Sequence, residues 1–296
     1  MGKPETITPS DGWKGELQQD TTVGRTDLTR WDTSAGRGTA RLITTLGRSV
    51  GAYTALILTL VIGIGVAFLM AFLVARVYDA TTEHDGIAAL DHPALLAAIQ
   101  VRTPQLDAFA AAIAYIFGTI GMPILACIAI LVLSLRRKSW TPVILIVGAG
   151  LGSLLMTIAG KDIIGRHRPA LSQAVPPFEY SPSFPSGHTL NATVIIGVIG
   201  YLLWLRRHSL TARTLCVLVP VLVSVTVGFT RILLGAHWFT DVIAAWLLGA
   251  AWLTLIITTH RLYLTARKHT AQKHNSQKHN AREQHVPPAS GTPSLP

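Results

Sequence analysis

One histidine and one aspartate are spaced so that they could act together. His237 and Asp241 are four residues apart, so in a helix both side chains leave from the same face. A carboxylate bonded to one ring nitrogen of a histidine selects the tautomer and leaves the other nitrogen free to attack or to accept a proton. A His/Asp pair at this spacing fits a structural role as well as a catalytic one, so other residues must decide between the two.

A second histidine, His188, follows Pro185-Ser186-Gly187 at the expected start of a long apolar segment. The first backbone N–H groups of a helix have no partner within the helix, and the helix dipole favours an anion there. The Ser186 hydroxyl and the Gly187 N–H therefore form a candidate anion site. An ordinary turn followed by an N-cap explains the same residues without a ligand.

Four basic residues accompany these groups: Lys161, Arg166, Arg168 and Arg231. Each is at or just beyond the end of an apolar segment, where an uncompensated charge near the hydrocarbon is costly. One such residue alone would be interpreted as an anchor that reaches the lipid headgroups. Four together favour an anionic ligand, because Arg presents a planar fork of donors that matches phosphate and Lys adds a compact charge. For Arg166, a further phosphate contact and headgroup anchoring both stay open.

Long apolar segments must position these residues. Half of the 296 residues are hydrophobic, 14% are charged and the mean hydropathy is +0.44, whereas a soluble domain carries about 25% charged residues. Blocks of about 20 apolar residues are long enough to cross a membrane as helices. The sequence predicts six spans: Ala52–Ala75, Ala108–Leu135, Pro142–Gly160, Thr189–Leu205, Leu215–Thr230 and Val242–Thr259. The expected fold is therefore an all-α, polytopic, six-transmembrane-helix bundle.

The two faces of such a bundle differ in charge. One face, which includes both termini, holds 19 Lys and Arg with 7 Asp and Glu, and the other holds 6 and 8. Cytoplasmic connections are enriched in Lys and Arg, so both termini are expected to be cytoplasmic. The histidines, Asp241 and the four cations all fall on the opposite, extracytoplasmic face. The net charge of +10 follows from the cytoplasmic excess and requires no nucleic-acid partner.

The first outer connection, Arg76–Asp107, is long and acidic. Within it, Asp91-His92-Pro93 is typical of a helix start, with Asp as the cap and Pro in the first turn. Ala94–Ile99 would then be a short helix on the membrane surface, although plain loop structure fits nearly as well.

Three motifs, in this order, resemble the signature of the type 2 phosphatidic acid phosphatase superfamily, in its bacterial membrane lipid phosphatase branch. They are Lys161-x6-Arg168-Pro169, Pro185-Ser186-Gly187-His188 and Arg231-x5-His237-x3-Asp241, and ten positions match at the family's spacing. The motifs cover Lys161–Asp241, and the six-span layout extends the resemblance over about Ala52–Thr259.

The resemblance implies a covalent mechanism. His237 would be the nucleophile that forms a phosphohistidine, and Asp241 would orient it and raise its basicity. His188 would protonate the leaving oxygen and then activate water.

The resemblance also implies a phosphate clamp, formed by Lys161, Arg168 and Arg231 with help from Ser186 and the N–H of Gly187. Because three cations can replace a metal ion, activity is expected without a metal or another cofactor.

Two other classes of function compete with hydrolysis. A transporter or channel would place ionisable residues in mid-span, but the predicted span interiors are almost free of charge. A phospholipid-binding relative that does not hydrolyse would be expected to lack one of the two histidines or the aspartate. The haloperoxidases that share the fold are soluble proteins, whereas the composition of this chain is that of a membrane protein.

An outward-facing site in the cell membrane predicts substrates exposed on that side: undecaprenyl-type diphosphate, phosphatidate or phosphatidylglycerol phosphate, with sugar phosphates still open. The expected partners are the lipid phosphate and the membrane lipids, and the sequence predicts no oligomeric state. Residues 1–50 and 263–296 are expected to be disordered cytoplasmic tails around a phosphatase domain at 51–262. The second tail is basic and rich in His, and favours anionic lipid over weak metal binding.

Overall fold

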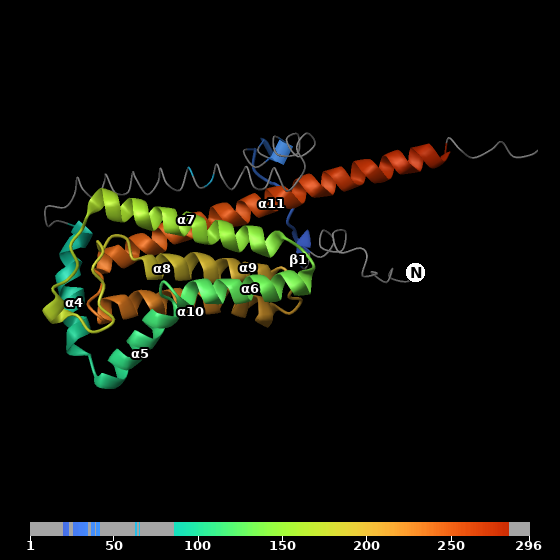
Figure 1. The fold of residues 1–296 in the computed structure, drawn as a ribbon. Coiled ribbons are helices and arrows are strands. Elements are labelled where there is room, and N and C mark those ends of the chain that lie inside the picture. The colour runs from blue at the N-terminus through green and yellow to red at the C-terminus, as the bar shows by residue number, and fades with distance from the viewer. Residues whose placement is uncertain are drawn as a thin grey trace, which may run out of the picture.

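The computed structural model describes residues 20–23, 26–34, 37, 38, 40, 41, 63, 65 and 86–283. Two short antiparallel strands, β1 (Thr22–Val23) and β2 (Thr26–Asp27), precede the helices. The helices are η2 (Gly86–Leu90), α4 (Asp91–Gln100), α5 (Pro104–Ile116), α6 (Gly121–Arg137), α7 (Thr141–Ile164), η3 (Leu171–Gln173), α8 (Gly187–Asn191), η4 (Ala192–Ile196), α9 (Gly197–Trp204), α10 (Leu210–Leu233) and α11 (Phe239–Glu283). The long helices lie alongside one another, with α4 and α5 at one end of the bundle and the strands at the other (Figure 1).

Among the residues that the structure describes, four helices are long and apolar enough to cross a membrane: α7, the continuous helix α8–η4–α9, α10, and α11 as far as Lys268. Together α5 and α6 pass the same test, so the described residues contain up to five spans. These five correspond to five of the six predicted spans. The remaining predicted span, Ala52–Ala75, is the first in the sequence and lies outside the described residues except for Gly63 and Gly65. The architecture is that of a multi-pass helical membrane protein.

The predicted span Ala108–Leu135 is not one straight helix, because α5 and α6 meet at a bend of 54°. The chain turns so closely there that a Cβ on Gly121 would lie 2.2 Å from the Ile116 carbonyl oxygen. Pro123 follows in the first turn of α6, where its missing N–H costs no intrahelical bond. The bend borders the candidate site, since a Cβ on Gly118 would lie 3.1 Å from Nε2 of His188.

A close helix crossing sets the position of α11 against α7. Trp252 of α11 is 1% exposed and lies over Gly152 of α7, where a Cβ would meet the indole ring at 2.3 Å. The indole N–H also donates to the Ala149 carbonyl at 3.3 Å. Small residues allow helix backbones to approach in this way. The crossing fixes the spacing of the two helices that carry Lys161 and Asp241.

The structure differs from the predicted tail boundaries at the other end of the bundle. Helix α11 continues beyond 262 as far as Glu283, and Tyr263 is 1% exposed within the core. Part of the N-terminal segment packs against it: the Trp31 indole donates to Thr265 Oγ1 at 3.0 Å, and Lys268 pairs with Asp27 at 2.6 Å. Each tail supplies contacts that offset the entropy lost on ordering the other, and composition alone does not reveal such a partner.

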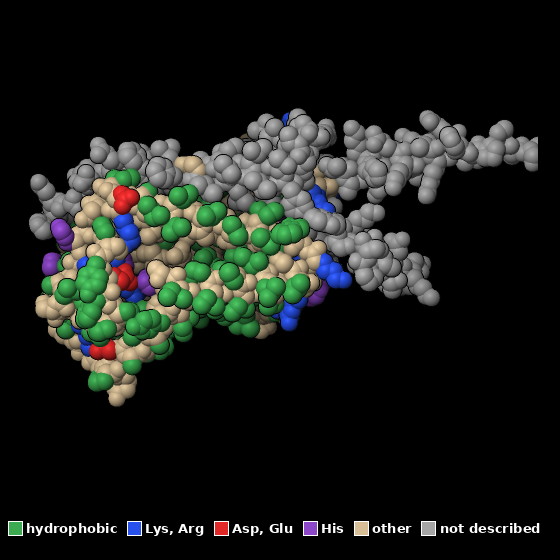
Figure 2. All heavy atoms as spheres, in the orientation of Figure 1, with side chains coloured by type: hydrophobic (Ala, Val, Ile, Leu, Met, Phe, Trp, Pro, Cys, Tyr) green, Lys and Arg blue, Asp and Glu red, His purple; other side chains and the backbone are tan. Residues whose placement is uncertain are grey.

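Charged side chains are sorted between the two ends of the bundle. Figure 2 shows Lys and Arg at one end, and acidic, basic and His side chains gathered together at the other, with hydrophobic side chains along the flank between them. The predicted site residues lie at the mixed end.

Candidate active site

Four helix ends converge at the mixed end of the bundle. Lys161 is in the last turn of α7, His188 is in the first turn of the helix that begins at Gly187, and Arg231 is in the last turn of α10. His237 lies two residues before the start of α11. The segments between these helices run across the same end, so residues far apart in sequence meet there.

A tight turn joins α10 to α11 and keeps Arg231 next to His237. The Arg231 carbonyl accepts from the N–H groups of Ala236 and His237 at 3.1 and 3.3 Å. Gly235 has a φ of +67°, which glycine adopts without strain. A Cβ there would also lie 2.6 Å from the Gln173 carbonyl oxygen, so this turn requires glycine twice over.

His237 and Asp241 are both buried, at 1% and 0% exposure. The stretch is not helical throughout as the shared face required, because α11 begins at Phe239, but the turn before it still brings His237 Nδ1 to 3.5 Å from Asp241 Oδ2. The same Oδ2 accepts from the Trp238 N–H at 2.9 Å. The other ring nitrogen, Nε2, points into the cation cluster, 3.1 Å from Arg168 Nη1. The geometry leaves Nε2 as the nitrogen that can react.

Arg168 brings a guanidinium donor to that nitrogen, and Arg231 is held next to His237 by the backbone turn. Arg168 also donates to the carbonyl of Ala236, which precedes the histidine. The Arg231 side chain is 0% exposed, and its Nε and Nη1 are buried without a hydrogen-bond partner among the described residues. Buried donors are nearly always paired. Unpaired guanidinium donors beside a reactive histidine therefore indicate a place for an anion.

Lys161 lies beside these two arginines rather than on the same carboxylate. Its Nζ donates to Ser181 Oγ at 2.7 Å and to the Pro182 carbonyl at 2.6 Å. Arg168 Nε donates to the Ser181 carbonyl at 2.7 Å. The loop at 181–182 thus holds two of the three predicted clamp cations in place.

Glu179 is the site residue that sequence reasoning missed. Its Oε1 lies 2.5 Å from Arg231 Nη2 and its Oε2 lies 2.8 Å from Arg168 Nη2. The carboxylate is also between the two histidines, with Oε1 3.5 Å from His188 Nδ1 and Oε2 3.7 Å from His237 Nε2. One anionic group therefore touches both arginines and both histidines.

The charge of Glu179 is strongly maintained. Burial raises the pKa of this carboxyl, but the contact with His237 and the charge of Arg231 outweigh burial and hold the pKa well below its usual range. A signal for this residue does exist in the sequence: it is the one acid in the outer segment between the first and second motifs, 169–184, where buried cations need a counter-charge.

Ser186 and Gly187 lie at the site, but the polar groups of Ser186 already have hydrogen-bond partners within the protein. Ser186 is 0% exposed, and its hydroxyl pairs with Thr189 Oγ1 at 2.9 Å. Its backbone N–H donates to the Asp241 carbonyl at 3.2 Å. Gly187 lies against α7, where a Cβ would meet Thr157 Cγ2 at 3.1 Å.

Arg166, for which the sequence left a phosphate contact and headgroup anchoring open, is paired with two carboxylates. Its Nη1 lies 2.7 Å from Asp241 Oδ1, and its Nη2 lies 2.5 Å from Asp91 Oδ2. The sequence predicted that Asp91 caps its own helix, and this prediction is wrong: Leu90 is the N-cap of α4, and no side chain makes a cap hydrogen bond. Asp91 accepts instead from the N–H of Thr240 in the first turn of α11, at 2.8 Å.

Metal ligands do not gather in this arrangement. Among the described residues, no group of three or more His, Cys, Asp or Glu side chains is placed to hold a metal ion. The acidic side chains of the site, Glu179 and Asp241, are paired with arginines instead.

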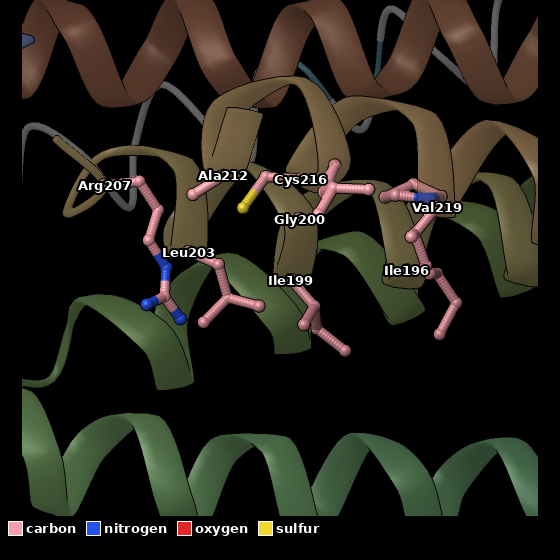
Figure 3. A pocket seen from close by; sticks show the side chains of 10 residues that line it. Ile196, Ile199, Gly200, Leu203, Arg207, Ala212, Cys216 and Val219 are labelled. Atoms are coloured by element: carbon pink, nitrogen blue, oxygen red, sulfur yellow. The ribbon is translucent and has the colours of Figure 1, made fainter. Parts of the chain in front are cut away.

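An apolar groove lies elsewhere, between α9 and α10, and contains none of the predicted site residues. Its lining includes Ile196, Leu203 and Val219, with Arg207 at one end (Figure 3). It is therefore separate from the His188 and His237 cluster.

Comparisons with known proteins match the part of the chain that contains the candidate active site. Residues 141–263 match the family described as the PAP2 superfamily. The chain is 28% identical over 183 residues to phosphatidylglycerophosphatase B of Bacillus subtilis (strain 168), over 60% of this chain and 87% of the relative. It is also similar to a crystal structure described as the first transmembrane PAP2 type phosphatidylglycerolphosphate phosphatase from Bacillus subtilis, with a TM-score of 0.57, 27% identity, and coverage of 64% of this chain and 93% of that one.

Proposed function

Because the chain belongs to the PAP2 superfamily, we propose that it hydrolyses a phosphate or diphosphate ester of a membrane lipid through a phosphohistidine on His237. The comparisons confirm the family that the three motifs predicted, and the protein is a membrane lipid phosphatase. The substrates that we propose are phosphatidylglycerol phosphate, phosphatidate and an undecaprenyl-type diphosphate. The similarity to phosphatidylglycerophosphatase B supports the first of these.

The reaction begins with attack of His237 Nε2 on phosphorus. The P–N bond forms as the P–O bond to the lipid breaks, and His188 gives its proton to the leaving lipid oxygen. Asp241 holds the Nδ1 side of the His237 ring. His188, now neutral, then takes a proton from water, which attacks phosphorus and releases inorganic phosphate from His237.

Lys161, Arg168 and Arg231 hold the equatorial oxygens of the phosphoryl group in this proposal, with Ser186 and the N–H of Gly187. Arg231 is buried and Lys161 and Arg168 are half-buried, so the three charges are held in place and stabilise developing negative charge with little reorganisation. The cations neutralise that charge in place of a metal ion, so the proposed reaction needs no cofactor.

Glu179 must give way in this proposal, because its carboxylate occupies the position between both histidines and both arginines. A phosphate that enters takes over its contacts. The observation that carries the proposal is the buried Arg231, whose Nε and Nη1 have no partner among the described residues. A tetrahedral anion that replaces the planar carboxylate has further oxygens to offer these donors.

For topology, we propose six spans in the cell membrane, with both termini in the cytoplasm and the site on the extracytoplasmic side. The distribution of Lys and Arg supports this orientation. Cysteine labelling near Pro176 tests it: reaction with an impermeant reagent from outside is expected, and reaction from the cytoplasm alone would contradict it.

Hydrolysis is tested with purified protein against a panel of lipid mono- and diphosphates, with His237→Ala as the control. Substrate labelled with ³²P is expected to leave acid-labile label on the wild type but not on His237→Ala. The alternative, a phospholipid-binding or transport protein of the same fold, predicts lipid binding by both proteins and phosphate release by neither.

A further inference from the structure

Arg166 and Asp91 form a buried charge cluster that the proposed reaction does not use. Asp91 is 3% exposed and Asp241 is 0% exposed, so both carboxylates are removed from water. Each contacts one nitrogen of the same guanidinium, at 2.5 and 2.7 Å. A buried carboxylate is costly unless it is paired and hydrogen-bonded. One arginine thus compensates two buried acids from two different helices, α4 and α11.

The guanidinium is held in one orientation from several sides. Its Nη1 also donates to Thr240 Oγ1 at 2.8 Å, and its Cζ lies over the Trp238 ring, 5.4 Å from the ring centre. The Trp238 ring meets His92 of α4 edge-on at 4.9 Å. Arg166 is therefore fixed between α4 and the start of α11.

The contacts on Asp241 show what this fixation does. Arg166 occupies Oδ1, whereas Oδ2 accepts from the Trp238 N–H at 2.9 Å and lies 3.5 Å from His237 Nδ1. With Oδ1 held, the carboxylate cannot rotate away from the histidine. A residue that orients a reacting group in this way acts on catalysis without touching the substrate.

Asp91 pairs with Arg166 and also holds the start of α11. Its Oδ1 accepts from the N–H and the hydroxyl of Thr240, at 2.8 and 3.0 Å, and so caps the start of α11. Its own helix, α4, exposes large apolar side chains such as Leu96, at 52%, and follows the exposed Ile87 and Leu90 of η2. This helix contains Ala94–Ile99, which the sequence predicted as a short helix on the membrane surface.

We propose that Arg166, held by Asp91, is a positioning residue that fixes Asp241 toward His237 and joins the surface helix α4 to the nucleophile. This inference rests on the proposed function. It assigns Arg166 to the orientation of the nucleophile and not to the phosphate clamp, although Arg166 is only two residues from Arg168.

The test compares Arg166→Met with Arg102→Met. Arg102 is a matched control because it also anchors the end of α4, but to the Leu233 and Gln173 carbonyls at 2.7 and 2.8 Å. With a lipid phosphate as substrate, Arg166→Met is expected to lower kcat about 10- to 100-fold, the range for loss of an outer partner of a reacting group. KM and the inhibition constant for orthovanadate should stay near the wild-type values, because both terminal nitrogens of Arg166 are engaged by Asp91 and Asp241.

Two further variants keep the test decisive if Arg166→Met folds poorly. Arg166→Lys keeps the charge but not the fork, and should recover part of kcat. Asp91→Asn keeps the acceptor for Thr240 and removes one charge, and the double variant Arg166→Met/Asp91→Asn removes one charge of each sign. The loss of kcat in the double variant should be smaller than the product of the two single losses, since the residues act as one unit.

Three results would overturn the positioning role: an unchanged kcat in Arg166→Met, a rise in the vanadate constant as large as that of Arg168→Met, or an equal loss of kcat in Arg102→Met. A wild type that releases no phosphate from any lipid contradicts the proposed function instead. A double-mutant cycle on thermal unfolding reads the Arg166–Asp91 contact without turnover, so the two failures can be told apart.

Discussion

Replacement of Glu179 by Gln is expected to tighten the binding of phosphate and orthovanadate. In the structure the carboxylate is a ligand of Arg231 and Arg168 at 2.5 and 2.8 Å, so any anion that binds these arginines has to displace it. Gln has nearly the same shape and no charge. The variant thus removes the internal competitor while it leaves the cations in place.

The magnitude follows from two contacts and one ordered side chain. A hydrogen bond to a charged group contributes about 1.5 kcal/mol net at the lower end of its range, and there are two. Ordering a Glu side chain costs about 1.5 kcal/mol, so the internal contact is favourable by about 1.5 kcal/mol. Its loss corresponds to about tenfold tighter binding.

Isothermal titration calorimetry of orthovanadate against detergent-solubilised protein measures this change without turnover. Asp162→Asn is the matched control, since Asp162 is an exposed acid beside Lys161 and its loss should leave the affinity nearly unchanged. Glu179→Ala removes the amide that Gln retains and should bind at least as tightly as Glu179→Gln. Unchanged or weaker vanadate binding in both Glu179 variants would refute the idea that this carboxylate occupies the phosphate position.

Three further outcomes are expected. Loss of the general acid in His188→Ala should lower kcat about 10²- to 10⁴-fold on a lipid phosphate, but much less on p-nitrophenyl phosphate, whose leaving group needs no proton; equal losses on both would argue against that role. Gly152→Ala places a Cβ 2.3 Å from the Trp252 ring, whereas Gly150→Ala meets its nearest neighbour at 3.9 Å, so thermal unfolding should show the first variant destabilised by about 1–3 kcal/mol and the second nearly unchanged. Phosphate release should persist in excess chelator, and a loss that added divalent ion restores would contradict a metal-independent reaction.

The sequence alone determined that this is a membrane protein, where the spans within the described residues lie, and which residues form the candidate site. Apolar blocks of span length and the charge difference between the faces are local properties, and they depend on no tertiary contact. The three motifs worked because their residues lie at helix ends or in the short segments that join them, where spacing along the chain largely sets the position. For that reason His188, His237, Asp241 and Arg231 could be placed together before any coordinates.

Tertiary structure alone shows which partners three charged residues contact. Glu179, Arg166 and Asp91 act through partners that are 52, 75 and 75 residues away in sequence, and no local pattern distinguishes a buried counter-charge from a solvated one. The same reason explains the bend between α5 and α6 and the packing of the N-terminal segment on α11, since both depend on which surfaces meet. The sequence could therefore predict which residues carry chemistry, but only the fold shows which charges hold them in place.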